Sequence, residues 1–184
     1  MSTLRIALLL YFLSCGAGAA QPAKVDCLWT ALPTVVQTRL ELSIRLGEDV
    51  PVAVLNRFPD GALAKFLIAC GYDDSMHSFA LAHRYWLARA AYEISKTRLK
   101  LTNIAIAPLE AFLEKNTPLP FRAAIGEAVA NRKPGRAKQI ILQLLETVEA
   151  ARQTRGEPPM TLLQKRLLIA FAATRLVLMS FADQ

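Results

Sequence analysis

The chain has 184 residues, of which 53% are hydrophobic, and its 22 basic and 15 acidic side chains give a formal net charge of +7. This hydrophobicity excludes a disordered tail, while eight glycines and three cysteines are too few for a collagen-like fibre or a scaffold held mainly by disulfides. At this length we expect one globular domain whose core folds without a bound metal.

Residues 1–20 have the three-part layout of a secretory signal peptide. A basic start containing Arg5 precedes the apolar run 6–13, and a string of small residues then ends at Ala20. The apolar run is shorter than the roughly 20 residues needed to span a bilayer. We therefore expect export through the Sec route, cleavage after Ala20, and a mature domain at 21–184 in the periplasm or outside the cell.

Lipidation at Cys15 is the alternative outcome of processing. The residues before Cys15 resemble the cleavage motif of bacterial lipoproteins, although Leu13 stands where that motif has a small residue. Cleavage before Cys15 would leave a lipid anchor on the chain, whereas cleavage after Ala20 would release it from the membrane.

Cys27 and Cys70 are the two cysteines of the expected mature chain. In an oxidising compartment they are predicted to form one disulfide, which would stabilise the fold by on the order of 4 kcal/mol in the chain-entropy model. The alternative is two separate buried thiols. A catalytic thiol is not predicted, because neither cysteine has a histidine near it in sequence and no Cys-x-x-Cys spacing occurs.

The hydrophobic periodicity is helical almost throughout, and no segment alternates in the manner of a half-buried strand. We therefore predict an all-α fold, an irregular antiparallel bundle of about seven helices in a single domain with one disulfide. The predicted helical segments are 25–46, divided at Pro33, and 51–57, 62–70, 74–99, 103–115, 121–131, 136–152 and 161–182.

Several helix boundaries have recognisable signals. Asp73 or Asp74 is expected to cap the helix at 74–99, because a carboxylate accepts from the free N–H groups there. Thr161 and Gln164 have the spacing of a capping box at the start of the last helix. A turn is expected at 59–61 and a rigid proline connector at 117–120.

Residues suited to catalysis or metal binding are few. His77 and His83 lie six positions apart and point to different sides of a helix, so they cannot share a metal. Asp73 and His77 have the spacing of a surface ion pair, and His83 lies on an apolar stripe where a half-buried histidine is expected. Signatures of nucleophilic hydrolases and of phosphate-binding loops are absent. We predict no catalytic, cofactor-binding or metal-binding residues.

Acid–base catalysis by two carboxylates leaves no sequence motif, so an enzyme remains an alternative. Glu93 and Glu127 lie on predicted helices and are the candidates for a periplasmic hydrolase or lyase. That chemistry needs a concave pocket in which one of the two carboxyl groups is shielded from water. The simpler interpretation places both glutamates on solvated helix faces.

Charge is unevenly distributed along the chain. Residues 21–81 contain five basic and seven acidic side chains, whereas residues 82–184 contain sixteen basic and eight acidic ones. The cations are either solvated charges that stabilise helix ends or a surface for an anionic partner, which would be an acidic protein, a lipid head group or a cell-wall polymer. The two clusters are Lys96, Arg98 and Lys100, and Arg132, Lys133, Arg136 and Lys138.

These features predict an exported, helical accessory protein of the bacterial periplasm that binds another envelope protein, as immunity proteins, chaperones and assembly factors do. The alternatives are the carboxylate hydrolase or lyase and a basic module that binds lipid or cell wall. Nucleic acid is not an expected partner, because no aromatic residues interleave with the basic clusters. No transmembrane span is expected in the mature chain, since the apolar stretch 162–181 is interrupted by charged residues.

Overall fold

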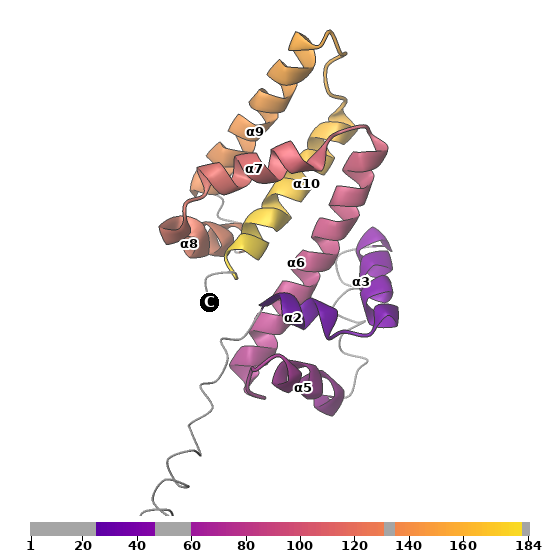
Figure 1. Ribbon diagram of the computed structural model, residues 1–184, viewed down its shortest axis with the longest axis vertical. Helices are drawn as coiled ribbons and strands as arrows, with labels where there is room; N and C mark the ends of the chain where they lie inside the picture. The colour runs from indigo at the N-terminus through magenta and orange to yellow at the C-terminus, as the bar shows by residue number, and fades with distance from the viewer. Residues whose placement is uncertain (1–24, 47–59, 131–134, 182–184) are drawn as a thin grey trace, which may run out of the picture.

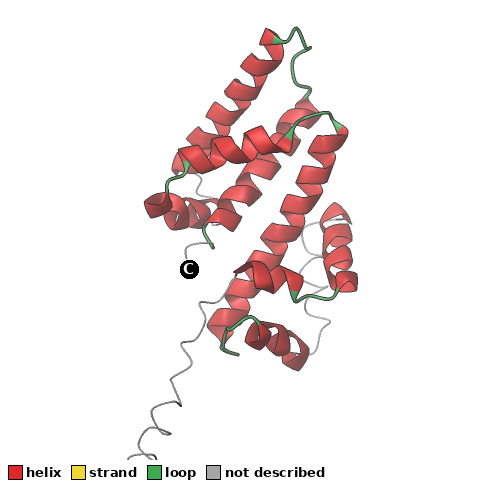
Figure 2. Cartoon of the chain, viewed as in Figure 1, coloured by secondary structure: helices red, strands yellow, loops and turns green. Residues whose placement is uncertain are grey.

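The computed structural model describes residues 25–46, 60–130 and 135–181. These residues form eight α-helices and no strand, which confirms the predicted all-α class (Figures 1 and 2). The expected signal peptide at 1–20, Cys15 and the predicted helix at 51–57 lie outside the described residues. The helices are α2 (Val25–Thr30), α3 (Thr34–Leu46), α5 (Asp60–Ala69), α6 (Met76–Leu101), α7 (Ile106–Asn116), α8 (Leu119–Ala130), α9 (Gly135–Thr154) and α10 (Leu162–Met179).

The two helices α6 and α10 run antiparallel and form the centre of the bundle (Figure 1). Large aromatic and aliphatic side chains at helical spacing give each of them an inward face, and these faces bury one another. Three contacts follow the pair from one end to the other: Gln164 Nε2 to the Thr102 carbonyl at 3.4 Å, the Tyr92 and Phe171 ring centroids at 5.3 Å, and those of Tyr85 and Phe181 at 5.5 Å.

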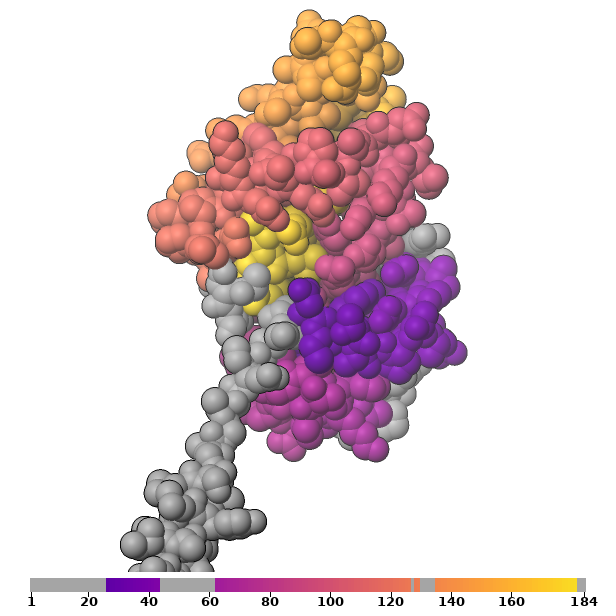
Figure 3. Space-filling model, viewed as in Figure 1, coloured from indigo at the N-terminus to yellow at the C-terminus, as the bar shows by residue number. Residues whose placement is uncertain are grey.

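The other helices form two groups along α6 (Figure 1). Helices α2, α3 and α5 pack on its N-terminal half, while α7 and α10 pack on its C-terminal half and α8 and α9 cover α10. One hydrophobic cluster contains residues from all eight helices. In the space-filling view a strip of α10 remains visible between α7 and α6 (Figure 3).

The disulfide between Cys27 and Cys70 is present, with the two Cα atoms 5.5 Å apart, which confirms the predicted pairing. Cys27 lies on α2, and Cys70 directly follows α5. The bond therefore ties together two short helices that both rest on α6. Short helices gain little stability from their own hydrogen bonds, so a covalent link between them adds to what their packing supplies.

The predicted helix at 103–115 begins later, at Ile106, and two segments predicted as connections are partly helical. A turn was expected at 59–61, but α5 begins at Asp60, because an acidic residue in the first turn favours the helix start and glycine is tolerated there. A rigid connector was expected at 117–120, but α8 begins at Leu119 and includes Pro120 in its first turn. Proline lacks an N–H group, and the first turn of a helix has no partner for that group in any case.

The N-terminal cap of α6 also differs from the prediction. Ser75, rather than Asp73 or Asp74, occupies the capping position, and its hydroxyl accepts from the Ser78 N–H at 3.2 Å. The Asp73 carboxylate accepts instead from the Ser75 backbone N–H at 3.2 Å and from the Ser75 and Ser78 hydroxyls. These hydrogen bonds lower the pKa of Asp73. They replace the ion pair that was expected between Asp73 and His77.

At the start of α10 the predicted capping box is confirmed. The Thr161 hydroxyl accepts from the Gln164 N–H at 3.2 Å, and the Gln164 side chain accepts from the Thr161 N–H at 2.8 Å. The local signal was sufficient here because both partners lie within one helical turn.

Within the described ranges, every helix falls short of the length or the apolar character that crossing a membrane requires.

Candidate functional site

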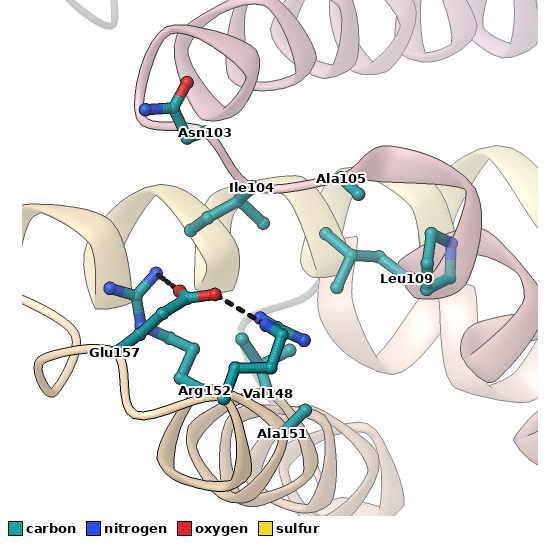
Figure 4. A pocket seen from close by; sticks show the side chains of 10 residues that line it. Asn103, Ile104, Ala105, Leu109, Val148, Ala151, Arg152 and Glu157 are labelled. Atoms are coloured by element: carbon teal, nitrogen blue, oxygen red, sulfur yellow. Dashed lines mark hydrogen bonds and ion pairs between the residues drawn. The ribbon is translucent and has the colours of Figure 1, made fainter.

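A pocket of about 310 Å³ lies between the connection from α6 to α7 and the C-terminal end of α9 (Figure 4). Asn103 adopts a left-handed conformation, with φ of 60°, where the chain leaves α6. Asparagine tolerates this conformation better than most residues, so the chain can turn sharply towards α7. The pocket wall is apolar on one side and charged on the other. Its apolar residues include Ile104, Leu109, Val148 and Ala151.

The charged side of this pocket is held together by its own ion pairs (Figure 4). Glu157 contacts Arg152 Nη1 at 3.1 Å and Arg155 Nε at 2.5 Å, and the hydrogen bond from Arg155 lowers the pKa of Glu157. Arg152 is only 8% exposed and also donates twice to the Pro158 carbonyl, at 3.1 and 2.9 Å. These contacts position the connection between α9 and α10.

The described pocket offers one carboxylate, Glu157, between two guanidinium groups, and it does not bring together an acid and a base. Glu93 is not among its lining residues and instead forms an ion pair with Arg89 on α6, at 2.9 Å. The side chain of Glu127, on α8, lies outside the described residues. The hypothesis of a hydrolase built on Glu93 and Glu127 therefore receives no support from this pocket.

A second polar cluster surrounds Tyr92, which is almost fully buried on α6. Its hydroxyl donates to Glu110 on α7, and burial, followed by this hydrogen bond, raises the pKa of Tyr92. Three cations lie near the ring: Lys96 Nζ is 5.3 Å from its centroid, Arg89 Cζ is 5.5 Å away, and Arg175 Cζ, from α10, is 6.0 Å away. Such contacts are attractive because the face of an aromatic ring carries partial negative charge.

The Tyr92 cluster joins three helices and is close to electrically balanced. Arg175 forms an ion pair with Glu114 of α7 at 2.9 Å, and Arg89 forms one with Glu93. This cluster was not predicted from the sequence. The spacing of Arg89 and Lys96 around Tyr92 on one helix was a visible signal, but the contributions of α7 and α10 depend on tertiary packing. We interpret the cluster as a junction that stabilises the bundle.

The acidic side chains beyond residue 82 are mostly engaged within the protein. Five of the glutamates described there contact a basic side chain or a tyrosine, and Glu146 is the exposed exception. Many cations in the same part of the chain are exposed and form no ion pair with a described residue. These cations are Arg84, Arg98, Lys100, Lys115, Arg136, Lys138 and Arg166.

The first predicted basic cluster is divided by the fold. Lys96 lies against the Tyr92 ring and therefore has a structural contact, whereas Arg98 and Lys100 are exposed. Both exposed residues lie in the last turn of α6, where cations interact favourably with the helix dipole. Arg98 and Lys100 could therefore stabilise the end of α6, bind a partner, or do both.

The second predicted basic cluster has a different position on its helix. Arg136 and Lys138 lie in the first turn of α9, where the helix dipole disfavours cations. The Arg136 guanidinium lies 4.7 Å from the centroid of the Phe121 ring, and Lys138 is exposed. Arg132 and Lys133 lie outside the described residues. Stabilisation of a helix end therefore does not explain Lys138.

His83 is half-buried on α6, as the sequence predicted, and burial lowers its pKa. His77 is exposed near the start of the same helix. Among the described residues, no group of three or more histidine, cysteine, aspartate or glutamate side chains is arranged to hold a metal ion.

Comparison with known protein families, with curated proteins and with solved structures finds no match.

Proposed function

We propose that this chain is exported and acts by binding an acidic protein of the bacterial envelope, as an immunity protein, chaperone or assembly factor does. The observation that carries the proposal is the separation of charge in the C-terminal part of the chain. Acidic groups there mostly form contacts within the protein, whereas cations such as Arg98, Lys138 and Arg166 face solvent and have no ion-pair partner among the described residues.

Unpaired surface cations create a positive potential that extends beyond the molecular surface. This potential speeds the encounter with an acidic partner and disfavours a basic one, so it contributes mainly to association rate and specificity. Ion pairs already formed within the protein, such as Glu149 with Lys165 at 3.2 Å, contribute much less to this field. The surface is therefore better suited to recognising an anionic partner than its net charge alone indicates.

Two features support export. Residues 1–20 have the layout of a secretory signal peptide. The disulfide between Cys27 and Cys70 is of a kind that persists in oxidising compartments and is rare where thiols are kept reduced. An exported chain meets the proteins of the periplasm and the cell surface. Among these, we propose that the partner is one with an acidic surface.

The test is to express the tagged full-length chain in its native host, crosslink in intact cells, purify the chain, and identify the proteins attached to it by mass spectrometry. We expect one acidic envelope protein in stoichiometric amount. The charge variant Arg98→Glu with Lys138→Glu should lose this protein. Because both substituted residues are exposed, the fold should be retained.

The matched control is Arg39→Glu with Lys65→Glu, which reverses two exposed cations on α3 and α5. This control should retain the partner. Recovery of the chain with only lipid or cell-wall polymer, or without any bound molecule, would contradict the proposal. Equal loss of the partner from both variants would contradict the role assigned to the C-terminal cations.

A further inference from the structure

The outward face of α10 is apolar and exposed. Leu162, Leu163 and Ile169 are 65%, 62% and 41% exposed, and Ala170 is exposed beside them. Positions 162, 166 and 169 follow helical spacing, so their side chains form one stripe along the helix surface. Arg166 is the charged residue of this stripe. Single exposed apolar residues are ordinary on protein surfaces, but several on one face of a helix are a feature of interaction sites.

The opposite face of α10 is fully used by the fold. Leu168, Phe171 and Leu176 are completely buried, and α10 contacts α6, α7, α8 and α9. In the described residues α10 is surrounded on its inner side only.

An ion pair shows which part of α9 borders the exposed stripe. Glu149 of α9 contacts Lys165 of α10 at 3.2 Å. Lys138 and Leu142 precede Glu149 by eleven and seven residues, so all three share one side of α9. Leu142 is 46% exposed and Lys138 is exposed. The seam between α9 and α10 is thus bordered by exposed apolar residues from both helices.

These residues define a surface that we call the α9–α10 surface. It combines four exposed large apolar side chains with two cations that form no ion pair among the described residues. Because α9 and α10 run antiparallel through the Glu149–Lys165 contact, Lys138 and Arg166 lie towards opposite ends of the seam, on the order of 15 Å apart. The surface consists of Lys138, Leu142, Leu162, Leu163, Arg166 and Ile169, and the exposed carboxylate of Glu146, four positions after Leu142, borders it.

We infer that the α9–α10 surface is the docking site for an amphipathic, acidic helix of the partner protein, an inference that rests on the proposed function. The apolar face of such a helix would cover the stripe, with carboxylates towards Lys138 and Arg166. A second copy of this chain is a poorer occupant, because self-pairing would bring together more cations, Lys138 and Arg166 of each copy, than exposed carboxylates, Glu146 of each copy. Two cations are also fewer than the four to eight that mark a typical anionic-lipid site.

The first test places a photo-crosslinking amino acid at position 169 of the full-length chain in its native host. The control carries the same amino acid at position 68, because Ile68 of α5 is the same residue type and is 59% exposed. We expect position 169 to crosslink to an acidic amphipathic segment of one protein, and position 68 to form no such crosslink.

The possible outcomes distinguish an error in the proposed docking site from an error in the proposed function. Crosslinking of an acidic protein at position 68 and not at 169 would overturn the assignment of the surface while leaving the proposed function standing. A crosslink from 169 to a second copy of the chain, to lipid or to a non-acidic protein would overturn the inference. If neither position forms a crosslink and the purified chain carries no partner protein, the proposed function is overturned as well.

A second test uses the purified chain and the captured protein. The variant Leu162→Ser with Ile169→Ser should weaken binding about tenfold or more, because exposed apolar residues at the centre of an interface become buried in the complex. The control Leu42→Ser with Ile68→Ser alters two equally exposed apolar residues on other helices and should leave the affinity unchanged. Equal affinities of both variants would overturn the inference, provided that circular dichroism shows both to be folded.

Discussion

The indole N–H of Trp86 donates a hydrogen bond to the backbone carbonyl of Leu28, 2.7 Å away and 58 residues earlier in the chain. Both residues are buried, and the bond fixes α2 against α6. Tyr85, the neighbour of Trp86, donates to Asp26 Oδ1 at 3.2 Å in the same region. Two adjacent side chains of α6 thus orient the first described helix of the bundle.

Trp86→Phe should lower the free energy of unfolding by about 1–3 kcal/mol, because it leaves the buried Leu28 carbonyl without its donor and removes part of a packed side chain. Urea unfolding followed by far-UV circular dichroism measures this change. Trp29→Phe is the control, since Trp29 is only partly buried and forms no side-chain hydrogen bond with a described residue. Equal losses in the two variants would contradict the role given to the Trp86 bond.

Removal of the disulfide should destabilise the protein without changing its fold. The bond joins cysteines 43 residues apart, and disulfides of this kind stabilise proteins by about 2–4 kcal/mol. Cys27→Ala with Cys70→Ala should therefore unfold at a lower urea concentration than the oxidised parent. A reductant should destabilise the parent and leave the double variant unaffected. A parent that is insensitive to reductant under unfolding conditions would contradict the disulfide.

Gly126 of α8 packs closely against the C-terminal end of α10. A Cβ atom at this position would meet Ser180 Cβ and Oγ at 2.3 Å and the Leu176 carbonyl oxygen at 3.2 Å. Gly126→Ala should therefore destabilise the protein by about 1–3 kcal/mol, despite the better helix propensity of alanine. Combining it with Ser180→Gly should restore part of the loss in thermal unfolding. An alanine variant as stable as the parent would contradict this packing.

The half-buried His83 should make stability depend on pH. Burial lowers its pKa below the ordinary value of 6.5, so the folded state holds the imidazole neutral more strongly than the unfolded chain does. The preference for the neutral imidazole contributes fully to stability above the unfolded-state pKa of 6.5. This contribution is lost as the pH falls through the lower pKa of the folded state. The free energy of unfolding should therefore decrease as the pH falls below 6.5. His83→Gln should flatten this decrease, whereas His77→Gln at an exposed position should not.

The elements that were predictable from the sequence are those with local signals. The capping box of Thr161 and Gln164 was correct because its partners share one helical turn. The disulfide was predictable because the expected mature chain contains two cysteines, Cys27 and Cys70. The helix start at Leu119 was missed because proline is both a turn residue and a favourable residue in the first turn of a helix.

The clusters formed by tertiary packing were less predictable because they combine distant segments. The Tyr92 cluster joins α6 with Glu110 of α7 and Arg175 of α10, and no spacing along the chain indicates these contacts. Whether a basic residue is engaged or exposed is likewise a tertiary property. Lys96 and Arg98 are two positions apart in one predicted cluster, yet Lys96 lies against a ring and Arg98 faces solvent.

The most informative measurement is the affinity of the purified chain for its captured envelope protein as a function of salt concentration. If exposed cations recognise an acidic partner, the affinity should fall steadily as salt screens the charges, mainly through a lower association rate. The Arg98→Glu and Lys138→Glu variant should bind more weakly and respond less to salt. An affinity that is independent of salt, and equal for the parent and this variant, would contradict recognition by charge.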